Sequence, residues 1–124
     1  MALATTLALA FMAQGAIDAP ATVFDVGYEE LVQGEDRAAA EAIEACTQLE
    51  ADDPARLINH GIALARMGRF TEARADFEAA ANADTSVELE TSTGDFADSR
   101  HLARRALASL ERGEFARYYA MSMR

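Results

Sequence analysis

The sequence predicts an all-α fold, a superhelix of helical hairpins, on three observations. First, the phrase GRFTEARADFEAA at residues 68–80 repeats the small-residue pattern of GEDRAAAEAIEAC at residues 34–46, after an interval of 34 positions. A fixed interval of this size is typical of stacked helical units. Second, the chain is rich in alanine, leucine and glutamate and has no tryptophan and only two prolines, which favours helix. Third, isolated glycines separate the apolar stripes.

The second unit, residues 54–86, shows the hairpin pattern most clearly. Asp53-Pro54 is a helix-start signal, because aspartate caps free N–H groups and proline tolerates the first turn. Gly68 is expected to end this helix, and a second helix is predicted from Phe70 to Ala81. The apolar residues of the first helix recur at three- and four-residue spacing: Leu57, Ile58, Ile62, Leu64 and Ala65.

The first unit, residues 20–53, is expected to form the same hairpin. Asp18-Ala-Pro20 would start its first helix and Gly34 would stop it. Its apolar and small positions are Val23, Val26, Gly27 and Leu31, followed by Ala39, Ile43 and Cys46. Gly27 and Gly61 are expected in the middle of helices, where glycine costs about 1 kcal/mol relative to alanine. Close approach of helices at Ala39 and Ala73 is the expected compensation.

The repeat is interrupted after Asp84. Residues 87–98 form an insertion, within which alternation near residues 87–97 predicts a short β-hairpin with its turn around Gly94, although a loop is also compatible. Residues 99–124 then restart the helical pattern, because Gly113-Glu-Phe115 echoes Gly68-Arg-Phe70 at an offset of 45. Tyr118 takes the place of a small residue, so this is a divergent third repeat, as expected at the end of a repeat array.

The two complete units resemble tetratricopeptide repeats, a family of 34-residue helical hairpins. In the second unit the family's positions hold Leu57, His60, Gly61, Leu64, Ala73 and Phe77. In the first unit they hold Val23, Val26, Gly27, Glu30, Ala39 and Ile43. The closing proline is replaced by Ala51 and Thr85. The resemblance implies a tetratricopeptide-like α-α superhelix covering roughly residues 20–124.

Residues 1–19 form an apolar N-terminal segment. There is no charged side chain from Met1 to Ile17, and Ala13-Gln14-Gly15 has the small residues of a signal-peptidase site, with cleavage before Ala16. A basic start to the segment is missing. We therefore expect an exported or periplasmic bacterial protein. A first helix packed on the superhelix, with a cytoplasmic location, and a membrane anchor are the alternatives.

Charge and motifs exclude several functions. The net charge of −10 argues against nucleic-acid binding. A single cysteine, Cys46, rules out an internal disulfide, and neither His60 nor His101 has a second ligand at helical spacing, so no metal site is expected. We expect no cofactor and no enzymatic activity, and we interpret His60 as a packing residue between helices.

The resemblance implies a protein–protein interaction module that binds a peptide segment or protein partner through its concave face. Its candidate partner-binding residues are Phe24, Tyr28, Leu31, Ile58, Ile62 and Arg66, with Ala103 and Leu107 on the third unit. Ile58 and Ile62 would form an apolar strip, and Arg66 would bind a carboxylate or carbonyl at its end. The alternative is a structural self-assembly unit, a homo-oligomer whose acidic N-terminal and basic C-terminal ends dock. Residues 1–53 hold 11 acids and one arginine, whereas residues 99–124 hold six arginines and two acids.

Overall fold

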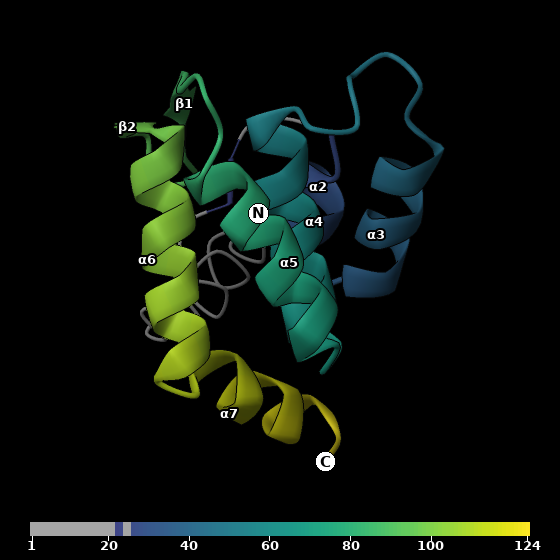
Figure 1. Ribbon diagram of the computed structural model, residues 1–124. Coiled ribbons are helices and arrows are strands. Elements are labelled where there is room, and N and C mark those ends of the chain that lie inside the picture. Colours follow the sequence, from purple (N-terminus) through teal and green to yellow (C-terminus); the bar gives the residue numbers. More distant parts are fainter. Residues whose placement is uncertain (1–21, 24–25) are drawn as a thin grey trace, which may run out of the picture.

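A computed structural model describes residues 22–23 and 26–124, and Figure 1 shows a mostly helical molecule with one small sheet. The helices of the described residues are α2 (Tyr28–Val32), α3 (Asp36–Ala45), α4 (Pro54–Arg66), α5 (Phe70–Ala81), α6 (Ser99–Glu111) and α7 (Glu114–Ser122). The strands are β1 (Glu88–Glu90) and β2 (Phe96–Asp98). Within the described part of the chain, no helix is both long and apolar enough to cross a membrane.

Helices α4 and α5 form the hairpin predicted for the second unit. Asp53 caps α4 by accepting a hydrogen bond of 3.1 Å from the backbone N–H of Arg56, and Pro54 occupies the first turn. Gly68 has φ +82° in the loop between the helices, and α5 begins and ends at the predicted residues. Helix α4 lies at the centre of the molecule, because it packs against α2, α3, α5, α6 and α7.

Gly61 allows the close approach of α4 and α5. A Cβ atom at this position would lie 2.5 Å from Cε1 of Phe77, well inside van der Waals contact. The prediction of a mid-helix glycine at a helix–helix contact is confirmed at Gly61. Ala73 is fully buried, but it is the Phe77 ring that fills the space over the glycine.

The first unit departs from its prediction, because Gly27 is not in the middle of a helix. It has φ +82° and precedes α2, which has only five residues. Val23, expected on the same helix, instead forms an isolated antiparallel bridge with Thr91. The left-handed conformation of Gly27 ends the helical pattern on its N-terminal side, and the Ile43 side chain occupies the space beside it. The predicted start signal at Asp18 and Pro20 lies outside the described residues.

The insertion forms the β-hairpin rather than a loop. Strands β1 and β2 are antiparallel, with Leu89 opposite Ala97, and Gly94 has φ +85° in the turn. Ser99 closes the open end of the hairpin, because its Oγ accepts a 3.0 Å hydrogen bond from the N–H of Val87. The hairpin leads directly into α6, whose N-terminus is capped by the Asp98 carboxylate.

The last helix, α7, runs across the ends of α4 and α5 rather than alongside α6 (Figure 1). Gly113, with φ +76°, makes the turn, and the buried ring of Phe115 stacks on Phe77 with 6.1 Å between centroids. Further along α7, the Tyr119 ring packs edge-on against the Phe70 ring, with 6.4 Å between the ring centroids. Aromatic side chains thus hold α7 in a position that a regular hairpin helix would not take.

Candidate functional site

The predicted concave strip is not a surface. Ile58 and Ile62 are both 0 % exposed, and Leu31 is 2 % exposed. The prediction that they face an open groove is wrong, because α4 is surrounded by helices and its apolar stripe is the centre of the core. Ala103 is also buried and Leu107 is half-buried against the same core. Phe24 lies outside the described residues.

Arg66 does not reach outward for a partner's carboxylate. Its Nη1 donates a 2.9 Å hydrogen bond to the carbonyl of Leu31 and lies 3.5 Å from Oδ1 of Asp36. Its guanidinium also lies 5.2 Å from the ring centroid of Tyr118, whose hydroxyl donates to Asp36. Burial raises the pKa of Asp36, and Arg66 opposes this. Arg66 on α4 therefore contacts α2, α3 and α7. Tyr28 on α2 is half-buried.

A different feature opens to solvent between α3, α4 and α5. This cleft, here called the His60 cleft, has a volume of about 190 Å³. Its walls combine apolar and charged side chains: Ile43, Glu44, Ala51, Arg56, Leu57, His60 and Asp76. Helix α4 supplies the floor, and one carboxylate comes from the helix on either side.

His60 lies between these two carboxylates. Its Nδ1 is 2.6 Å from Oδ2 of Asp76 on α5, and its Nε2 is 3.5 Å from Oε2 of Glu44 on α3. The second distance is too long for a strong hydrogen bond, so Nε2 has no described hydrogen-bond partner. The hydrogen bond to Asp76 raises the pKa of His60, an effect that burial opposes and Glu44 reinforces.

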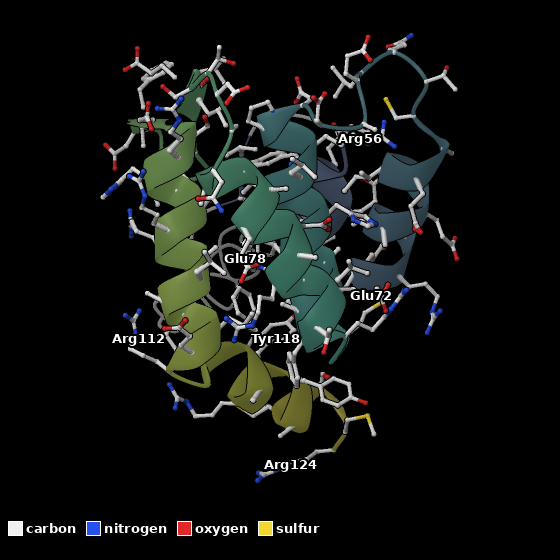
Figure 2. The ribbon with its side chains drawn as sticks, in the orientation of Figure 1. Arg56, Glu72, Glu78, Arg112, Tyr118 and Arg124 are labelled. Carbon is white, nitrogen blue, oxygen red and sulfur yellow. The ribbon has the colours of Figure 1, made fainter. Side chains whose placement is uncertain are left out.

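The rim of the cleft is held by Arg56, which Figure 2 shows beside the loop between α3 and α4. Its Nη1 donates hydrogen bonds of 3.0 Å and 3.1 Å to the carbonyls of Cys46 and Leu49. These carbonyls follow the end of α3 and would otherwise lack partners within the helix. Arg56 thus ties the loop to the rim of the cleft through Nη1.

The His60–Asp76 pair resembles the base and orienting carboxylate of acid–base catalysis. The residues that line the cleft include no serine, threonine or cysteine that could act as a nucleophile. No group of three or more metal-ligating side chains in the described part of the chain has a geometry that could hold an ion. The lining can instead attract a cation, because it has two carboxylates, Glu44 and Asp76, and one arginine, Arg56.

Sequence reasoning placed His60 between helices but missed its two partners. A signal was present, since Gly61 and Phe77 were expected on facing helices. His60 and Asp76 each precede one of these residues, so close packing of Gly61 on Phe77 brings them together. Asn59 was also missed. Fully buried, it donates to the carbonyls of Val23 and Val26 and accepts from the N–H of Val23.

Comparisons of the chain with protein-family models, with curated proteins and with solved structures found no match.

Proposed function

We propose that this chain is a tetratricopeptide-like protein-interaction module that binds a partner by accepting one of its basic side chains in the His60 cleft. The 34-residue interval and the glycine-mediated contact between α4 and α5 support the family resemblance. The observation that carries the binding proposal is the cleft itself, which combines two carboxylates with the apolar side chains of Ile43 and Leu57.

The side chains that line the His60 cleft indicate which kind of ligand it can bind. The methylene groups of a long basic side chain would contact Leu57 and Ile43, while its charged end would contact the oxygens of Glu44 and Asp76 that His60 does not occupy. Arginine suits this arrangement better than lysine, because its planar guanidinium can donate to both carboxylates at once. Glu44 is the more accessible of the two, with 51 % of its side chain exposed against 19 % for Asp76.

His60 regulates this site through competition. When protonated, its imidazolium satisfies Asp76 and partly neutralises Glu44. A guest cation would have to enter against that positive charge. Binding is therefore expected to be tighter when His60 is neutral, at a pH above its raised pKa.

A pair of peptides tests the proposal. A short peptide with one central arginine is compared by calorimetry with the same peptide carrying citrulline, which has the same shape without the charge. We expect the arginine peptide to bind more tightly. Glu44→Gln should weaken it about fivefold, the equivalent of about 1 kcal/mol for a half-exposed ion pair.

The matched control is Glu78→Gln, an exposed acid on α5 that does not line the cleft. It should leave the affinity unchanged. Equal affinity for the arginine and citrulline peptides would refute the proposal, and so would equal losses in the two glutamate variants.

The net charge of −10 supports a basic protein partner, because it would attract a positively charged segment over a distance. It also supports the absence of nucleic-acid binding. We further propose that the protein is exported, on the uncharged stretch from Met1 to Ile17. Mass spectrometry of the protein from its host should find a mature N-terminus near Ala16, and intact Met1 in a cytosolic fraction would contradict export.

A further inference from the structure

Two exposed helix faces of opposite charge lie at opposite edges of the molecule. Figure 1 places α6 at one edge and α3 at the other, with α4 and α5 between them. Neither face can therefore neutralise the other within one chain. This geometry concerns surfaces outside the His60 cleft, and it does not depend on the function proposed for that cleft.

The α6 outer face consists of His101, Arg104, Arg105 and Ala108, which recur at three- and four-residue spacing on the side turned away from the core. Both arginines are exposed, and no described carboxylate lies within ion-pair distance of either. The other charged residues of α6 and its C-cap have partners. Glu111, the one acid of the helix, is exposed and lies 3.5 Å from Arg74 on α5. Arg100 donates to the carbonyls of Ala83 and Asp84, and Arg112 pairs with Glu114 at 2.8 Å.

The α3 outer face consists of Ala38, Glu41, Ala42 and Ala45, at the same helical spacing. Glu41 is exposed and has no described cationic partner. The three alanines leave the backbone open to close approach, so that long side chains from another helix can lie across it. Arg37, the one cation on this helix, is exposed and lies one helical turn before Glu41 on the same side.

We propose that a second copy of this chain docks its α6 outer face on the α3 outer face of the first. Arg104 and Arg105 would then flank Glu41, and Ala108 would meet the alanine positions of α3. Such a contact is heterologous, because each copy uses a different surface, so it extends into a chain or closes into a ring. Charge complementarity favours a second copy as the partner, because the same chain carries both the α6 outer face and the α3 outer face.

The net charge of −10 opposes association of identical copies. At physiological ionic strength, however, charges more than about 8 Å apart are largely screened, so the local arginine–glutamate contacts dominate. One helix–helix contact is at the small end of specific interfaces. The association should therefore be weak and depend on protein concentration.

Charge reversal on either face tests the proposal by sedimentation at rising protein concentration. Wild-type protein should self-associate, and Glu41→Arg or the double variant Arg104→Glu/Arg105→Glu should each weaken this at least about tenfold. An equimolar mixture of the two variants should recover association, because the intact α6 face of one variant meets the intact α3 face of the other and the two reversed faces also carry opposite charges. Far-UV circular dichroism should show unchanged helix content, since all three residues are exposed.

Glu78→Arg is the control for Glu41→Arg, because it makes the same charge reversal at an exposed position of α5 that belongs to neither face. A wild-type protein that stays monomeric up to about millimolar concentration overturns the proposal, since that is the weak limit of specific binding. Variants that associate like the wild type, a mixture that stays monomeric, or a Glu78→Arg variant as impaired as Glu41→Arg would also overturn it. None of these outcomes bears on arginine binding in the His60 cleft.

Discussion

Gly61 is the position at which the packing of α4 on α5 can be tested most sharply. Gly61→Ala adds one methyl group, which would lie 2.5 Å and 2.8 Å from two carbons of the Phe77 ring. The ring cannot move aside easily, because it is fully buried and stacks on Phe115. Overpacking of this kind costs about 2 kcal/mol, while alanine gains about 1 kcal/mol over glycine in helix propensity.

The two effects leave a net loss of about 1 kcal/mol in the free energy of unfolding, or about 4 °C in melting temperature. A double-mutant cycle in urea separates them. When Phe77→Leu has removed the ring, Gly61→Ala should become stabilising by about 1 kcal/mol, because only its helix propensity remains. If Gly61→Ala destabilises the protein equally in both backgrounds, the Phe77 ring is not what excludes a side chain, and the packing described here is wrong.

Three further predictions concern stability. The pKa of His60 is raised on folding by its hydrogen bond to Asp76, so its contribution is fully present below about pH 6.5 and is lost as the pH rises through the higher folded value. The stability difference between wild type and His60→Gln in urea should therefore shrink from pH 6 to pH 9, and a constant difference would contradict this. Asn59→Leu should lower the free energy of unfolding by about 3 kcal/mol in chemical denaturation, because the N–H and carbonyl of buried Val23 lose their partner. A decrease below about 1 kcal/mol would show that Asn59 does not anchor the segment at Val23. Asp53→Ala should lower the unfolding free energy by about 1 kcal/mol through loss of the α4 cap, and an unchanged melting curve would contradict the cap geometry.

The sequence was sufficient where local signals and packing agree. Asp53-Pro54 starts α4, and Gly68 lies in the loop that follows this helix. Both bounds of α5 follow from the apolar spacing. The β-hairpin was also predictable, because alternation around Gly94 is a local signal.

The first unit shows why the repeat register alone misleads. Gly27 aligns with Gly61 in sequence, but one has φ +82° at a helix start and the other lies inside α4. The difference comes from distant partners, since Asn59 and Thr91 hold the segment at Val23 out of a helix. Glycine is compatible with both conformations, so the sequence of the repeat cannot distinguish them.

The binding site was mispredicted for a related reason. Family resemblance assigned Ile58 and Ile62 to a concave surface, which assumes that the first helix of each hairpin has one open side. In this chain α7 crosses the end of α4 instead of extending the array, and α4 is enclosed. Tyr118 in place of a small residue was the sequence signal for this change, but its partners Asp36 and Arg66 are too distant in sequence to be inferred.

Binding of a basic side chain in the His60 cleft can be measured through the pKa of His60 itself. Nuclear magnetic resonance can follow both histidines across pH with and without the arginine peptide, and exposed His101 on α6 serves as the internal reference. A guanidinium bound to Glu44 and Asp76 must disfavour the imidazolium, so saturating peptide should lower the pKa of His60, while the His101 signal at a fixed pH should not move. A His60 pKa that does not change on saturation, or that changes equally with the citrulline peptide, would show that the cleft does not bind the guanidinium.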